Sequence, residues 1–333
     1  MIVIAEVILR RVFVMNVIEK YQSLLILVAI GLGLLLGQIV MIERYAELFI
    51  LPLLIAMLYG LFLSIPIKGF LSAFQHRKFL GSSVLLNFVW TPILAWALGA
   101  LFLADHPALW LGFILLLVTP CTDWYLIFTS IAKGNVHLST SVLPVNLLLQ
   151  VILLPLYLII FAGTMEMVHL PTIFESVFYV LFLPFILATF TRFIFRNKTN
   201  FLQSKVLPFF NTAQLVFLCL AIVAMFASQG TYLMNNLEVL WLLLLPLLLF
   251  FLINFFISLF AGRILRFRYE DTASLNLTII ARNSPVALAI VLAAFPEQPL
   301  IALALIIGPL IELPVLAIIS QALLKRRKKY LGL

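Results

Sequence analysis

Long apolar runs separated by short polar segments dominate this chain of 333 residues. A helix needs ~20 predominantly apolar residues to cross a bilayer, and the pattern predicts ten such helices. We expect them near residues 22–41, 46–66, 80–104, 108–132, 136–162, 170–194, 203–228, 237–262, 271–295 and 298–323. The chain is therefore predicted to be an all-α integral membrane protein.

Polar residues beside a proline interrupt the fourth and the ninth predicted spans. The interruptions read Thr119-Pro120-Cys121-Thr122-Asp123-Trp124 and Ala281-Arg282-Asn283-Ser284-Pro285. Freed backbone groups and charges at membrane depth are tolerated mainly where they line a cavity or a protein-enclosed site. We expect both helices to be discontinuous and crossed, with breaks at Pro120 and Pro285. Matching breaks in two halves of a membrane protein indicate a transporter's binding site.

The ten predicted spans divide into five and five at the loop near residues 163–169. An odd number per half inverts the second half in the membrane, and polar features correspond, since Asn146 lies in the fifth span and Glu312 in the tenth. We expect inverted five-helix repeats at residues 22–162 and 170–323. A cytoplasmic N-terminal segment, 1–21, and a basic cytoplasmic tail, 324–333, should flank them.

Composition and charge support a membrane location. Hydrophobic residues make up 65% of the chain and charged residues 10%, too apolar for a single soluble core. The net charge of +8 does not require a nucleic-acid partner, because 19 of the 21 Lys and Arg residues fall in loops on one side. Arg44 lies on the other side and Arg282 within a span. The prediction is a cell-membrane protein with both termini cytoplasmic and the Lys325–Lys329 run as a topology anchor.

Several classes of function find no support in the sequence. Cys121 and Cys219 both lie within predicted spans, which excludes an extracellular disulfide framework. Enzyme signatures such as HExxH, GxSxG and the P-loop are absent, and the four histidines lack metal-ligand spacing. We expect neither an enzyme nor a bound cofactor or metal. We also expect no cleavable signal peptide in residues 1–14, and Met15 is a second candidate start.

Three ionisable side chains, Asp123, Arg282 and Glu312, lie deep within predicted spans. An isolated charge there costs at least ~2.5–3.5 kcal/mol, so each needs a partner or a proton. Asp123 and Arg282 are expected to pair if spans four and nine cross, either as part of a binding site or only to hold the crossing together. Glu312 has no obvious basic partner, so burial should favour its protonated form. It is a candidate proton carrier or a neutral structural hydrogen-bond donor.

Smaller polar side chains complete the candidate substrate and ion site. Cys121 follows a predicted helix break, where N-terminal amides favour a reactive thiolate, although buried thiols are commonly inert. Thr122, Asn146, Asn283 and Ser284 offer hydroxyl and amide groups for a small polar solute or a desolvated cation. Gln150 is a further amide of this kind. Trp124, Tyr125 and Phe128 either line the same cavity or, more commonly for such residues, face lipid.

Two motifs resemble the arsenical-resistance permease branch of the bile acid:sodium symporter superfamily. The first is Pro120-Cys121-Thr122 with Lys133-Gly134 and Asn146 at the family's spacing, and the second is Gly308-Pro309-Leu310-Ile311-Glu312-Leu313-Pro314-Val315-Leu316. The resemblance implies a panel of spans one, two, six and seven beside a core of the other six. It also implies that Cys121 and Glu312 are essential and that arsenite leaves in exchange for protons.

The chain departs from the family pattern in and around both breaks. Arg282-Asn283-Ser284-Pro285-Val286-Ala287-Leu288 replaces a segment that usually reads Ser-Asn-Asn-Phe-Glu-Leu-Ala, so one carboxylate is lost and a guanidinium gained. Asp123-Trp124 replaces small or apolar residues. Thr278 stands where sodium-coupled relatives carry a carboxylate, which makes sodium coupling less supported than proton coupling.

These observations predict a secondary transporter working by alternating access on a small solute. The first hypothesis is proton-coupled efflux of arsenite or a similar small oxyacid, and the alternative is sodium- or proton-coupled transport of an organic anion. A remote alternative is an intramembrane enzyme or sensor, which lacks support because Asp123 has no second aspartate within a span and no loop is long enough for an output domain. The oligomeric state is left open.

Overall fold

The computed structural model describes residues 22–64, 74–122, 124–164, 178–197, 201–235 and 240–331. The expectations for residues 1–21 and for Asp123 lie outside these residues. Every regular element of the described chain is helical: α2 (Gln22–Leu36), α3 (Val40–Leu63), α5 (Arg77–Leu85), η2 (Leu86–Trp90), α6 (Thr91–Phe102), α7 (Pro107–Leu117), α8 (Trp124–Ile131), α9 (Val136–Thr164), η3 (Phe178–Phe182), α11 (Leu183–Ile194), η4 (Phe195–Asn197), η5 (Leu202–Val206), α13 (Leu207–Met234), α14 (Leu240–Ile264), α15 (Tyr269–Ile280), α16 (Ser284–Ala294) and α17 (Pro299–Leu331).

The lengths of these helices make the chain a multi-span integral membrane protein. Six helical segments of the described chain are long and apolar enough to cross a membrane, and four shorter apolar helices have 10–17 residues. Each predicted span overlaps one of them. Two of the shorter ones, Pro107–Leu117 and Ser284–Ala294, belong to the interrupted fourth and ninth spans. The ten-span inverted repeat stays a prediction.

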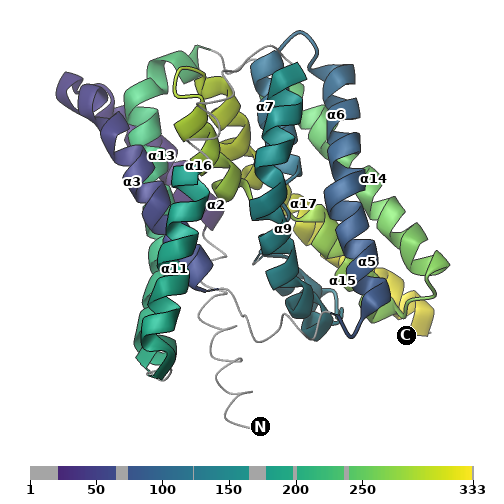
Figure 1. Cartoon of the computed structure of the whole chain (residues 1–333). Coiled ribbons are helices and arrows are strands. Elements are labelled where there is room, and N and C mark those ends of the chain that lie inside the picture. The colour runs from purple at the N-terminus through teal and green to yellow at the C-terminus, as the bar shows by residue number, and fades with distance from the viewer. Residues whose placement is uncertain are drawn as a thin grey trace.

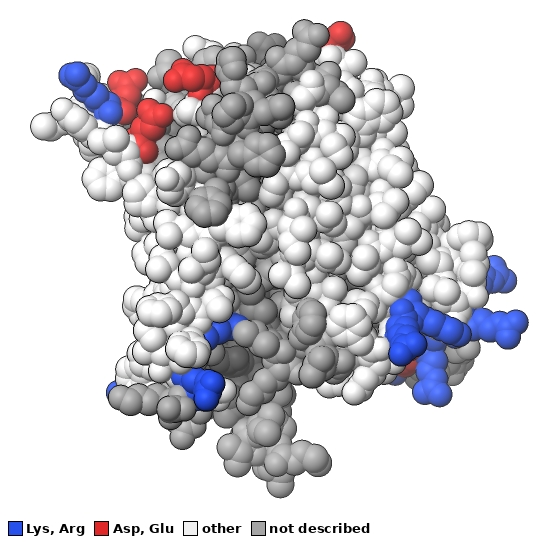
Figure 2. Space-filling view, viewed as in Figure 1, with Lys and Arg blue, Asp and Glu red and all other residues white. Residues whose placement is uncertain are grey.

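Charge is distributed unevenly along the molecule. On the face shown in Figure 2, Lys and Arg gather at the lower end, acidic residues gather mainly at the upper end, and the broad band between them carries almost no charge. Large apolar side chains are exposed on several helices, for example Leu48 at 70% and Phe190 at 59%. Lipid is the natural solvent for that band, and the charge-rich ends fit the two membrane surfaces.

Prolines explain the π-helical turns. Each π-helical turn of the described chain, η2, η3 and η5, is followed two residues after its end by Pro92, Pro184 or Pro208. A proline has no N–H and its ring clashes with the carbonyl four residues earlier, so a wider turn before it relieves the clash. The helices continue through these prolines, and those with Pro92 and Pro208 are long enough to cross a membrane.

The helices form two groups (Figure 1). α13 packs on α2 and α3, and α11 packs on α3. We call these four the panel helices. The remaining α-helices, the core helices, pack mainly among themselves, with α17 on α7, α14 on α15 and α16 on α17. α16 also contacts α3 and so lies at the boundary between the groups.

α17 is longer than its predicted span. The sequence pattern ends the span at residue 323 and assigns 324–333 to a tail, whereas the helix continues to Leu331. Lys and Arg are good helix formers, no glycine or proline interrupts Lys325–Tyr330, and positive charge is favourable at a helix C-terminus. The basic run is therefore helical as far as Leu331.

Glycines bring α7 and α17 close together beside the interrupted helices. A Cβ atom on Gly112 would lie 2.5 Å from the carbonyl oxygen of Ile301 and 2.9 Å from Cβ of Ala304. A Cβ atom on Gly308 would lie 2.6 Å from the side chain of Leu116. Small residues permit such close approach of helices in membranes, and this approach brings Leu116, near the end of α7, against Gly308 of α17.

We expect Gly112→Ala to lower the stability of the folded protein by about 1–3 kcal/mol, because the new methyl group must displace backbone of α17. Thermal unfolding in detergent measures the loss. Gly31→Ala is the matched control, since nothing lies within 4 Å of its added Cβ. Equal midpoints for the two variants would contradict the close approach of α7 and α17.

Candidate functional site

The two interruptions predicted from sequence are present in the structure. The fourth span is divided between α7, which ends at Leu117, and α8, which begins at Trp124. The ninth is divided between α15, which ends at Ile280, and α16, which begins at Ser284. Pro120 lies within the first interruption, and Pro285 lies in the first turn of α16, where a proline's missing N–H does no harm.

The interrupted segments pair with each other through their backbones. The N–H of Cys121 donates to the carbonyl of Ala281 at 3.0 Å, and the N–H of Asn283 donates to the carbonyl of Thr119 at 2.7 Å. Pro120 and Arg282 face each other in the resulting antiparallel bridge. The backbone groups released by one broken helix are thus partly satisfied by the other, and we call this meeting of the two segments the crossing.

Arg282 is buried at this crossing, with 3% of its surface exposed. Its Nη1 donates to the carbonyl of Leu117 at 3.0 Å, and its guanidinium carbon lies 5.2 Å from the ring centroid of Phe250. Leu117 ends α7, so the positive charge caps the negative end of that helix and also stacks over an aromatic face. Nε and Nη2 have no hydrogen-bond partner among the described residues. The predicted pairing with Asp123 stays a prediction.

Glu312 contacts the same residue. Its Oε1 accepts a hydrogen bond from the backbone N–H of Arg282 at 2.8 Å, and 3% of its surface is exposed. The sequence pattern offered Glu312 no basic partner, but the structure places Arg282 beside it. Across the described part of the chain, no ion pair within 4.0 Å joins the guanidinium and this carboxylate. Glu312 thus contacts the backbone of Arg282 and not its guanidinium group.

The polar side chains around Cys121 converge from both interruptions. Cys121 and Thr122 are each 3% exposed, and Asn283 Nδ2 donates to Thr122 Oγ1 at 3.4 Å. Ser284, the first residue of α16, is 4% exposed. Together with Arg282 and Glu312, these residues form one buried polar cluster built by three segments of the chain, which we call the crossing site.

Asn146 and Gln150 are buried one helical turn apart on α9, which packs on α7 and α8. Neither side-chain amide has a hydrogen-bond partner among the described residues, although the side chains are only 0% and 1% exposed. A buried amide without partners costs about 1–3 kcal/mol, so these two side chains lower the stability of the described fold. No hydrogen bond within the described residues links Asn146 to the crossing site.

Sequence reasoning missed Phe250, because one phenylalanine in an apolar helix carries no distinguishing signal. It also favoured lipid exposure for Tyr125, which is wrong. Tyr125 is 0% exposed and its hydroxyl donates to the carbonyl of Ser139 at 2.8 Å. Thr278 is buried and its hydroxyl donates to the carbonyl of Ser274 at 2.7 Å, within its own helix.

Paired helix interruptions with buried charge between them are typical of membrane transporters, and the comparisons with known proteins agree with that class. Residues 51–236, more than half of the chain, match the Sodium Bile acid symporter family, and the chain belongs to that family.

The chain is 28% identical over 329 residues to the Arsenical-resistance protein Acr3 of Corynebacterium glutamicum, an alignment that covers 92% of this chain and 89% of the relative. An uncharacterized transporter of Synechocystis is 29% identical over 213 residues, covering 63% of this chain and 56% of that protein. An uncharacterized protein of Bacillus subtilis is 25% identical over 241 residues, covering 72% and 76%.

Proposed function

We propose that this chain exports arsenite, or a similar small oxyacid, across the cell membrane in exchange for protons. The observation that carries the proposal is the burial of Cys121 in the crossing site, where Glu312 accepts a hydrogen bond from the backbone N–H of Arg282. The similarity to an arsenical-resistance protein over 92% of the chain supports the same substrate. The proposal involves no enzymatic step and no cofactor.

The thiol of Cys121 suits this substrate, because soft sulfur ligands favour soft centres such as trivalent arsenic. Arsenous acid is neutral near pH 7 and can enter a buried polar site without carrying a charge. The thiol displaces one hydroxyl group of arsenous acid, which leaves as water, and one As–S bond forms. Water reverses the exchange when the substrate leaves. Thr122, Asn283 and Ser284 supply hydrogen bonds for the remaining hydroxyl groups.

Glu312 provides the proton coupling. Its buried carboxylate lies against the backbone of Arg282 and can be charged while the guanidinium is near, or neutral when it takes up a proton. Binding of a proton and binding of arsenite would then alternate at the crossing site. Alternating access follows if the panel helices and core helices move relative to each other, in two inverted repeats with both termini in the cytoplasm.

We expect Cys121→Ser to lower arsenite flux about tenfold or more, because serine keeps the size but loses the soft ligand. The purified chain in proteoliposomes with an imposed pH gradient measures this flux. Cys219→Ser is the matched control, since Cys219 lies on panel helix α13, away from the interruptions. Arsenite flux that is equal in wild type and Cys121→Ser would remove the thiol from the mechanism.

Arg282 favours a second candidate function, the uptake of an organic anion with sodium or protons. Among the described residues, Nε and Nη2 of its guanidinium have no hydrogen-bond partner, so they can donate to the carboxylate or sulfonate of a substrate. The chain also belongs to the Sodium Bile acid symporter family. The same proteoliposomes decide between the two functions. Uptake of a radiolabelled bile acid without any movement of arsenite would support the second.

A further inference from the structure

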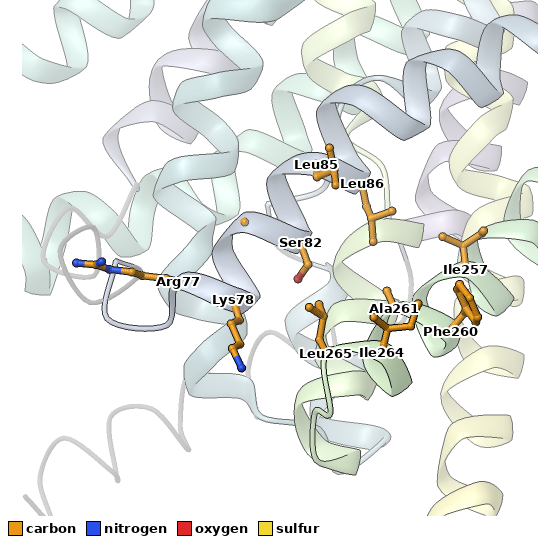
Figure 3. A pocket seen from close by; sticks show the side chains of 11 residues that line it. Arg77, Lys78, Ser82, Leu85, Leu86, Ile257, Phe260, Ala261, Ile264 and Leu265 are labelled. Atoms are coloured by element: carbon orange, nitrogen blue, oxygen red, sulfur yellow. The ribbon is translucent and has the colours of Figure 1, made fainter.

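An apolar groove opens between α5 and the end of α14, outside the crossing site (Figure 3). Its volume is about 440 Å³, and it is lined by Arg77, Lys78, Gly81, Ser82, Leu85, Leu86, Ile257, Phe260, Ala261, Ile264 and Leu265. Phe260 and Ile264 are 63% and 61% exposed. The groove therefore opens outward, toward the surroundings of the helices.

The position of the groove corresponds to a membrane surface. Arg77 begins one candidate membrane span, Arg77–Phe102, and Ile264 ends another, Trp241–Ile264. Headgroups of lipids lie at this level and acyl chains lie deeper, toward the middle of each span. The polar and apolar ends of the groove follow the same order, with Lys78 and Ser82 near the helix start and Leu86 and Ile257 further along.

Gly81 shows that the groove is open to a molecule from outside the chain. It lies in the middle of α5, where glycine is unfavourable compared with alanine. Its φ is not in the left-handed range, and nothing lies within 4 Å of a Cβ atom added to it. Neither backbone conformation nor close packing of the protein requires glycine here. The missing side chain widens the groove instead.

The charges at the groove lack acidic partners. Within the described residues, neither Arg77 nor Lys78 forms an ion pair with an Asp or Glu side chain. Figure 3 shows Lys78 extending toward one end of the groove, whereas Arg77 extends from the same helical turn away from the other labelled side chains. Arg263 and Arg266 flank the opposite wall in sequence, on either side of Ile264 and Leu265, and both are exposed. This end of the groove is positively charged and suits an anionic group.

We propose that this groove is a binding site for an anionic phospholipid, whose phosphate lies at Lys78, with Arg77 adding positive charge nearby, and whose acyl chain lies along Leu85, Ile257 and Phe260. Positive charge at the membrane surface selects the headgroup, and the apolar wall accommodates the chain. The site does not depend on the transported substrate.

Native mass spectrometry of the full chain released from vesicles of phosphatidylglycerol and phosphatidylcholine tests the site. Wild type should retain phosphatidylglycerol preferentially. Arg77→Gln with Lys78→Gln should reduce that preference about 25-fold, since each basic residue near a membrane surface contributes about fivefold. Arg196→Gln with Lys205→Gln is the matched control, because it removes two exposed charges from η4 and η5 without touching the groove.

Gly81→Leu provides an independent variant, because it fills the groove and keeps every charge. It should reduce cross-linking of a phosphatidylglycerol that carries a diazirine on its acyl chain to the peptide containing residues 257–265. Unchanged lipid preference in the double charge variant, or unchanged cross-linking in Gly81→Leu, would overturn the proposal. Retention of added inorganic phosphate in place of lipid would also overturn it.

Discussion

Replacing Glu312 by glutamine should abolish arsenite movement driven by a pH gradient, down to the level of protein-free vesicles. Glutamine cannot release a proton, yet its side-chain oxygen can still accept the 2.8 Å hydrogen bond from the backbone N–H of Arg282. The variant should therefore fold and bind arsenite. Flux measured in proteoliposomes, with and without the gradient, tests the expectation.

Exchange of arsenite for arsenite across the same vesicles separates coupling from binding. Glu312→Gln should retain this exchange, since it requires no net proton movement. Glu297→Gln is the matched control, because that carboxylate is exposed between α16 and α17. If pH-driven flux persists in Glu312→Gln, another group carries the proton.

Arg282→Met should produce the largest loss of stability at the crossing site, about 3–5 kcal/mol. The substitution removes the hydrogen bond to the carbonyl of Leu117 and the stacking over Phe250, and it leaves Glu312 buried without a nearby positive charge. Thermal unfolding in detergent measures the loss. Arg282→Lys should recover only part of it, because an ammonium group lacks the planar, forked shape of guanidinium.

A double variant tests whether the charges of Arg282 and Glu312 stabilise each other. Adding Glu312→Gln to Arg282→Met removes the uncompensated carboxylate and should restore part of the lost stability. The two substitutions are then non-additive, as expected for groups in one network. Strictly additive changes in unfolding midpoint would show that Arg282 acts through Leu117 and Phe250 alone.

The membrane spans could be predicted from sequence because their cause is local. A run of ~20 apolar residues needs lipid whatever its neighbours are, and polar residues beside Pro120 and Pro285 signal a break within the run itself. Helix ends were less predictable. α17 continues beyond residue 323 because its basic residues are also good helix formers, and hydropathy does not distinguish a charged helical turn from a charged tail.

The residues of the crossing site were predictable, but their contacts were not. Polarity within an apolar span marks Cys121, Arg282 and Glu312 one by one. That Glu312 binds the backbone of Arg282, and that the guanidinium binds the last carbonyl of α7, depends on how three distant segments cross. A pattern of side-chain types does not predict hydrogen bonds to backbone groups, and it does not distinguish Phe250 from the other apolar residues of α14.

The two backbone hydrogen bonds at the antiparallel bridge restrict how the transporter can work. Separating Cys121 from Ala281, and Thr119 from Asn283, would expose four backbone groups where water is scarce, at a cost of several kcal/mol. We therefore expect the crossing site to keep one shape throughout the transport cycle. Selectivity would then be the same for loading and unloading, and the direction of net movement would depend on the gradients rather than on two differently shaped sites.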